Sequence, residues 1–207
     1  MGRLTHRTSP GWTYFVTTKT WQGRSIFQVH EVADILIDKL LEYRKRGSYL
    51  LHEFVVMPNH LHVILTPQGS VTLEKAIQLI KGGSSREIHI ARGNEIQIWQ
   101  SGFHESRLRD FADYRRKLDY IWFNPVTAKL VERPQDWPSS SASGNYPLEP
   151  VPQGLKPLSA RAVNVGAEAP TPGVSTKVVA SSGPEDRKRS TGPAQGLKCP
   201  PAREQRS

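Results

Sequence analysis

Two histidines, a tyrosine and an asparagine are the strongest candidates for a catalytic site in this sequence. His60 and His62 lie two residues apart in a run, residues 54–65, that is typical of a buried β-strand. Side chains two apart on a strand share a face, so both imidazoles can share a cation. Tyr120 and Asn124 are four residues apart in a segment that favours a helix, so they also project together. These parts suit metal-assisted phosphoryl transfer to tyrosine.

Each of these signals is weak alone. A His-x-His pair is more often structural than metal-binding, and a partly buried tyrosine at helical spacing usually just packs. Tyr14 and Tyr49 fall in expected strands. Tyr43 has no amide partner at helical spacing, and Tyr114 fits a core stripe. Tyr120 therefore remains the preferred nucleophile among the tyrosines.

The elements that must position these residues follow the order β-α-β-β-α-β, with one further helix. This order is that of a ferredoxin-like α+β fold, a four-stranded antiparallel sheet with helices on one face. The added C-terminal helix carries Tyr120, and the pair Gly82-Gly83 could kink the helix before it. The expected strands are 12–18, 49–57, 60–66 and 96–99, and the expected helices are 29–46, 72–91 and 111–123.

Composition predicts one folded domain and a polyanionic partner. The chain has 207 residues, a formal charge of +9 and a pI near 9.8, which favour a polyanionic partner. Its single cysteine, Cys199, excludes an internal disulfide and a Cys-rich zinc site. Because no run of about 18 apolar residues occurs, we expect no membrane partner and a cytoplasmic, nucleoid-associated protein.

A change of composition predicts the domain boundary. Residues 1–146 hold most of the aromatic side chains, whereas residues 147–207 are rich in Pro, Gly and Ser. Such a segment buries too little apolar surface to offset its ordering entropy. We therefore expect a folded domain over 1–146 and a disordered tail over 147–207.

A basic series with interleaved aromatic residues predicts a groove for single-stranded nucleic acid. His104 could contact DNA or belong to the active site, and a structural role is equally plausible. The basic residues of the series are Lys81, Arg86, Arg107, Arg109, Arg115, Arg116 and Lys117, and the possible stacking surfaces are Trp99, Phe103 and Trp122.

Three motifs in order, within residues 54–65, 98–109 and 120–131, resemble those of the REP-associated tyrosine transposases. These belong to the HUH single-tyrosine transposases of bacterial insertion sequences. The resemblance covers about residues 11–146. The joint occurrence of the three motifs is much more specific than any one of them.

The resemblance implies a metal-dependent enzyme. His60 and His62 match the histidines that bind a divalent metal in the family, and Asn124 matches the polar residue that completes the site. Mg²⁺ or Mn²⁺ is the expected ion. Tyr120 matches the tyrosine that attacks a DNA phosphate, forming a 5′-phosphotyrosine and freeing a 3′-hydroxyl. The implied substrate is single-stranded DNA with hairpins, the protein acts as a monomer or homodimer, and no nucleotide cofactor is implied.

The sequence departs from the family pattern at two places. Lys129 stands where a small residue or glycine is usual, at a helix end that favours a positive φ, which would cost roughly 1 kcal/mol. Glu105-Ser106 stands where an Asp and an Arg often follow the histidine. The second departure bears on a DNA contact.

Two other functions compete with a transposase. A four-stranded sheet with exposed aromatic residues can bind RNA or DNA without catalysis, but such a module would not need Tyr120, Asn124 and the histidine pair together. A replication initiator or relaxase would share the chemistry. The additional domains of such proteins have no room in this chain.

Overall fold

A four-stranded antiparallel sheet organises residues 11–155, the part of the chain that this computed structural model describes. The strand order β2-β3-β1-β4 is that of the predicted ferredoxin-like arrangement. β1 lies in the interior of the sheet, paired antiparallel with β3 on one side and β4 on the other. The strands are β1 Tyr14–Lys19, β2 Tyr49–Met57, β3 His60–Pro67 and β4 His104–Arg107.

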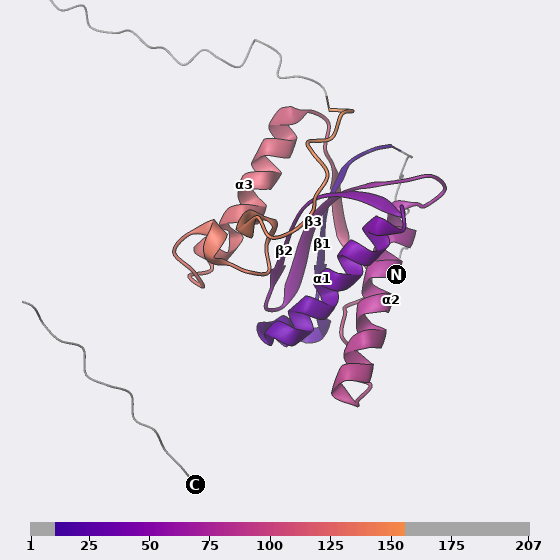
Figure 1. The fold of residues 1–207 in the computed structure, drawn as a ribbon, viewed down its shortest axis with the longest axis vertical. Coiled ribbons are helices and arrows are strands. Elements are labelled where there is room, and N and C mark those ends of the chain that lie inside the picture. The colour runs from indigo at the N-terminus through magenta and orange to yellow at the C-terminus, as the bar shows by residue number, and fades with distance from the viewer. Residues whose placement is uncertain (1–10, 156–207) are drawn as a thin grey trace, which may run out of the picture. The chain divides into compact units, whose positions relative to one another are not determined.

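Helices cover both faces of the sheet. α1 (His30–Lys45) and α2 (Leu73–Arg92) lie on one face, and α3 (Phe111–Thr127) lies on the other (Figure 1). The prediction of helices on one face holds for α1 and α2, and the additional helix packs on the opposite face. Short 3-10 helices are found at Trp21–Gly23, Ile26–Gln28, Pro134–Asp136 and Ser141–Ser143.

The alternation of β3 separates two hydrophobic cores. Leu61, Val63 and Leu65 are fully buried in the core under α1 and α2. Ile64 belongs to the smaller core under α3, which Tyr114, Leu118 and Ile121 complete. His60 and His62 have the same parity as Ile64, so they project from the α3 face, as the strand period predicts.

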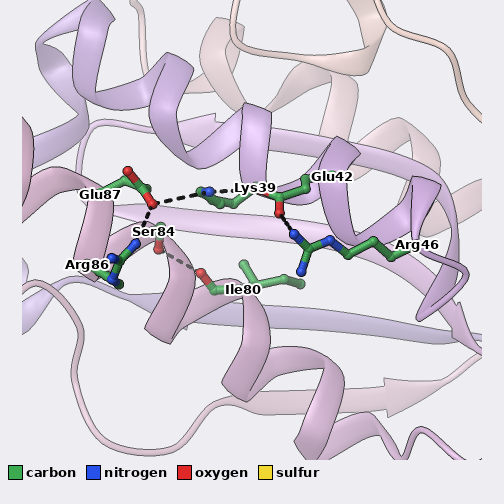
Figure 2. Close-up of polar contacts among 7 residues, drawn as sticks. All are labelled: Lys39, Glu42, Arg46, Ile80, Ser84, Arg86 and Glu87. Carbon is green, nitrogen blue, oxygen red and sulfur yellow. Dashed lines mark hydrogen bonds and ion pairs between the residues drawn. The ribbon is translucent and has the colours of Figure 1, made fainter.

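α1 and α2 are joined by polar contacts on their outer surface. Figure 2 shows the Lys39 ammonium between Glu42 of its own helix and Glu87 of α2, at N···O distances of 2.7 and 3.5 Å. Arg46 and Arg86 extend this network (Figure 2). Because exposed ion pairs each contribute about 0–1 kcal/mol, the buried faces of the helices supply most of the stability.

The two glycines of α2 do not break the helix, which runs as one element from Leu73 to Arg92. Gly83 instead allows close helix packing, since a Cβ there would lie 2.5 Å from the Tyr43 hydroxyl oxygen on α1. Thr72 caps the helix, as its position predicts, by accepting a hydrogen bond from the Lys75 backbone N–H at 3.2 Å.

The prediction of the fourth strand was wrong. Residues 96–99 form no strand, and only Trp99 makes an isolated bridge, to Thr20. Ile98 and Trp99 are buried in the core although they lie in a loop, so their apolar pattern resembles that of a strand. The actual strand β4 is short and polar. An edge strand with one neighbour needs few apolar side chains, so its pattern is weak in the sequence.

The last helix ends later than predicted, at Thr127 rather than Phe123. Pro125 lies inside it and removes only one backbone donor, while the following turn keeps its bonds, among them Ala128 N–H to the Asn124 carbonyl at 3.0 Å. Lys129 then has a φ of 58°, which confirms the expected left-handed conformation at this helix end.

The chain after α3 returns to cover the edge of β2. The Val56 N–H donates to the Ser139 carbonyl at 2.8 Å, which satisfies part of this open edge. Farther on, Glu149 pairs with Arg44 of α1 at 2.8 Å and accepts from the Leu51 N–H at 2.7 Å. Residues 147–155 therefore contact the sheet. The remainder of the tail, for which disorder is predicted, lies outside the described residues.

None of the helices in residues 11–155 combines the length and the apolar character that crossing a membrane requires.

Candidate active site

The histidine pair lies at the start of β3, on the α3 face of the sheet. In the register of β1 and β3, His62 is opposite Thr17 and His60 is opposite Lys19. The same Thr17 is opposite His104 of β4, so a row of polar side chains crosses three strands. The centroids of the His60 and His62 rings are 4.7 Å apart. Both imidazoles can therefore contact one ligand.

His62 is buried and keeps one ring nitrogen without a partner. Its Nδ1 lies 2.8 Å from the Thr17 hydroxyl oxygen, and its Nε2 makes no hydrogen bond although it is buried. Burial, with charge from His60, Lys117 and Lys19, lowers its pKa to about 3. The imidazole is thus neutral at physiological pH. When Nδ1–H donates to Thr17, Nε2 carries a free lone pair.

His60 is held on both sides by amide side chains. Its Nδ1 donates to the Asn59 carbonyl oxygen Oδ1 at 2.7 Å, which leaves Nε2 as the lone-pair nitrogen. Burial and the Lys19 charge lower the pKa of His60, and a hydrogen bond with the Asn124 side chain opposes this shift. The contact brings Asn124 of α3 to the histidine pair, as the sequence predicts.

Tyr120 lies beside these groups on α3. Its ring centroid is 5.0 Å from that of His62 and 5.9 Å from that of Phe15, in edge-on contacts. The side chain is 51% exposed, in contrast to the buried Tyr114 and Ile121 on the inner face of the helix. A tyrosine that contacts a histidine and remains open to solvent is accessible to a large substrate.

A cavity of about 630 Å³ joins these side chains into one site. The cavity is lined by Thr17, Lys19, Gly23, Asn59, His60, His62, Gln100, His104 and Tyr120.

The residues present fit a divalent metal. A buried ring nitrogen without a partner on His62, with its other nitrogen oriented by a hydroxyl, is the usual arrangement of a metal-binding histidine. His60 is likewise oriented through Nδ1, by Asn59, and its ring also hydrogen-bonds with the Asn124 side chain. Within residues 11–155 no group of three His, Cys, Asp or Glu side chains is placed to hold a metal ion. The candidate ligands are therefore two imidazoles and the amide oxygen of Asn124.

Sequence reasoning missed several residues of the cavity. Thr17 and Lys19 come to the histidines only through the strand register, which no local motif reveals. Gln100 and Gly23 reach the cavity from loops. Polarity in or next to an expected strand is the only sequence signal of Thr17, Lys19 and Gln100, and Gly23 carries none.

Of the residues predicted to contact DNA, His104 alone lines this cavity. Trp99 is buried, packs on Phe27 and donates its indole N–H to Ser84, so its ring is not available for stacking on a base. The Lys81 ammonium donates to the carbonyls of Gln100 and Gly102, at 2.5 and 2.8 Å. Lys81 therefore fixes the loop before β4.

The other predicted contacts are spread over the surface. Phe103 is partly buried against the larger core, and Arg86 lies on α2, on the opposite face of the sheet from the cavity. The Arg107 guanidinium stacks on Trp12, with its Cζ 3.1 Å from the ring centroid. Arg109 is exposed just before α3. On α3, Arg115 and Arg116 form ion pairs with aspartates of the same helix.

Comparisons with known proteins agree with this fold. A family model described as "Transposase IS200 like" matches residues 12–110. A REP-associated tyrosine transposase of Escherichia coli (strain K12) is 30% identical over 145 residues, which span 67% of this chain and 84% of that protein. A putative REP-associated tyrosine transposase of Haemophilus influenzae is 30% identical over 108 residues, spanning 47% of this chain and 61% of that protein.

A solved structure is similar as well. The chain superimposes with a TM-score of 0.58 and 28% identity on a structure described as a REP-associated tyrosine transposase bound to a REP hairpin. The alignment covers 75% of this chain and 94% of that one. The fold and the comparisons define a tyrosine transposase. Within that class, the chain belongs to the family of REP-associated tyrosine transposases.

Proposed function

We propose that this protein cuts and rejoins single-stranded DNA at or near hairpins, through a covalent bond between Tyr120 and a 5′-phosphate. The proposal is supported by its relatives, one of which is described as bound to a REP hairpin. The observation that carries it is the position of an exposed tyrosine, with its ring 5.0 Å from that of a buried histidine whose Nε2 has no partner.

The reaction exchanges one phosphate ester for another. The Tyr120 oxygen attacks the phosphorus, its proton passes to solvent, and a Tyr120 O–P bond forms as the P–O3′ bond breaks. The departing DNA takes a proton and ends in a 3′-hydroxyl. Because the phosphotyrosine keeps an ester bond, a 3′-hydroxyl can later attack it and restore the DNA without a nucleotide cofactor.

His60, His62 and Asn124 would hold the metal, Mg²⁺ or Mn²⁺. When bound, the ion polarises the phosphodiester and orients it for attack. The chain's own residues prepare that site: Thr17 and Asn59 orient the rings, and burial keeps His62 neutral. Phe15, stacked on His62 with centroids 5.4 Å apart, excludes water from one side of the ring.

The experiment is cleavage of single-stranded hairpin oligonucleotides labelled at the 5′ or the 3′ end, with Mn²⁺, on denaturing gels. We expect a covalent product that keeps the DNA 3′ of the cut. Tyr120→Phe removes the nucleophile and spares binding, so this product should disappear while hairpin affinity stays unchanged. Tight binding by the wild type without any product, over varied hairpins and metals, would instead favour a non-catalytic binding protein.

Variants of the histidines test the metal part separately. His62→Ala and His60→Ala should each abolish cleavage at every Mn²⁺ concentration, because each removes a ligand. His89→Ala is the matched control, since His89 on α2 bonds the Ile96 carbonyl far from the cavity. Metal-dependent cleavage at the wild-type rate in both ligand variants would contradict the metal assignment.

A further inference from the structure

Lys117 lies against the nucleophile and the histidine pair. One turn before Tyr120 on α3, its ammonium is 4.4 Å from the Phe15 ring centroid and 5.9 Å from that of Tyr120. Both rings contact His62, and the Lys117 charge contributes to lowering the pKa of that histidine. The cation therefore lies on the reacting side of the helix.

The neighbouring cations of α3 differ from Lys117. Arg115 pairs with Asp119 at 3.3 Å and Arg116 pairs with Asp113, and both guanidinium groups are well exposed. Within residues 11–155, no carboxylate forms an ion pair with Lys117. A half-buried ammonium beside apolar rings has lost part of its hydration. It is therefore suited to an anionic ligand.

Lys19 provides a second cation at the other end of the histidine pair. It is opposite His60 in the strand register, its side chain is exposed, and it lines the cavity. No ion pair to a carboxylate of residues 11–155 is formed by this lysine either. Phe15, under Lys117, and Lys19 are four residues apart on β1, or about 13 Å along the strand. This separation exceeds the reach of one phosphate group.

We propose that Lys117 and Lys19 are phosphate-binding residues of this site: Lys117 is a catalytic residue that contacts the scissile phosphate beside Tyr120, and Lys19 holds a neighbouring phosphate at the His60 end. This inference rests on the proposed DNA cleavage and names the side chains that place the DNA backbone across the cavity. Two cations flanking the histidine pair attract a polyanion along the row.

The two lysines have different expected effects. During attack, negative charge grows on the phosphoryl oxygens, so a cation in contact with them acts mainly on the rate. Lys117→Gln should lower single-turnover cleavage about 100-fold. Lys19→Gln should weaken binding of the hairpin with its flanking strand about 5- to 10-fold and change the rate at saturation less. Lys45→Gln is the control, because it removes the same charge from α1 on the other face of the sheet. It should change the cleavage rate and the hairpin affinity less than about 2-fold.

A coupling experiment tests contact directly. The phosphate that the wild type cuts is replaced by each isomer of an uncharged methylphosphonate, and the protein variants are compared on both DNAs. If Lys117 contacts this phosphate, Lys117→Gln should lower the cleavage rate about 100-fold on natural DNA and less than about 5-fold on one methylphosphonate isomer. An equal loss of cleavage rate on natural DNA and on both methylphosphonate isomers would contradict the proposed contact. The effect of Lys19→Gln should instead shrink when an adjacent phosphate is replaced by a methylphosphonate.

Binding measurements separate this inference from the proposed function. If the wild type binds hairpins and cuts none, the proposed cleavage fails. A methylphosphonate scan of the single-stranded flank, read by affinity, then still decides the lysine contacts. Coupling of Lys117 or Lys19 to one phosphate position would support them, and no coupling at any position would refute them. Circular dichroism and unfolding curves establish that each variant is folded.

Discussion

The Trp122 indole N–H donates a hydrogen bond to the Glu53 carboxylate at 3.0 Å, and this contact ties the helix that carries Tyr120 to strand β2. Ser141 donates to the same carboxylate at 2.6 Å, and Tyr114 lies at 3.5 Å. Burial raises the pKa of Glu53, and these hydrogen bonds partly oppose the shift. Glu53 thus connects three parts of the chain next to the site.

Replacement of Glu53 should loosen this junction. Glu53→Leu leaves Trp122 and Ser141 without their acceptor and should lower the free energy of unfolding by about 2–3 kcal/mol in urea titrations. Glu53→Gln keeps one acceptor oxygen and should cost about half as much. Equal losses in the two variants would show that packing, rather than the carboxylate, holds α3 on β2.

The pH dependence of stability should report on His52. Burial lowers its pKa in the folded protein, and its two ring nitrogens form hydrogen bonds with the Pro150 carbonyl and the Thr66 hydroxyl. The unfolded chain therefore binds the proton more readily. The contribution of His52 is fully present above its ordinary pKa of about 6.5 and is lost as pH falls through its lower folded-state pKa. His52→Gln should flatten the decline of unfolding free energy below pH 6.5. An unchanged slope would contradict this.

The adjacent glycines of α2 should respond oppositely to alanine. At Gly82 a Cβ meets nothing within 4 Å, so Gly82→Ala should gain helix propensity and stabilise the protein by about 1 kcal/mol. At Gly83 the Cβ would press on the Tyr43 ring, so Gly83→Ala should be less stable than Gly82→Ala by at least about 1 kcal/mol. Thermal unfolding of the pair measures the difference, and equal stabilities would remove the packing role of Gly83.

The segment after Tyr146 should contribute to stability. A chain ending at Leu155 keeps the Arg44–Glu149 pair and the His52 bond to Pro150, whereas a chain ending at Tyr146 loses both. We expect the shorter chain to be less stable by about 2–4 kcal/mol in urea. Composition alone places the boundary before this segment. Equal stability of the two chains would support a boundary at Tyr146.

Local periodicity predicted the parts of the site that lie on single elements. His60 and His62 share a face because strands repeat every two residues, and Tyr120 and Asn124 share one because helices repeat nearly every four. Which elements face each other is a tertiary property. Lys19 therefore could not be assigned to the site, and it reaches His60 only through the pairing of β1 with β3.

Residue type alone misled the sequence analysis where burial decides the role. Trp99 resembles a stacking surface in a basic segment, yet a loop places it in the core. Together with Ile98 it also gives the apolar pattern of a strand, although both residues lie in that loop. Lys117 is one of three consecutive cations and looks solvated. Only the structure separates it from Arg115 and Arg116, whose charges are paired along the helix.

The most direct test of the account is to identify the amino acid that carries DNA after reaction with a hairpin oligonucleotide. Trypsin releases residues 118–129 as one peptide, in which Tyr120 is the single tyrosine. Nuclease trimming followed by mass spectrometry should find a nucleotide 5′-phosphate on Tyr120 of this peptide, and none in Tyr120→Phe. A nucleotide attached to any other residue, or an adduct that persists in Tyr120→Phe, would contradict the assignment of Tyr120 as the nucleophile.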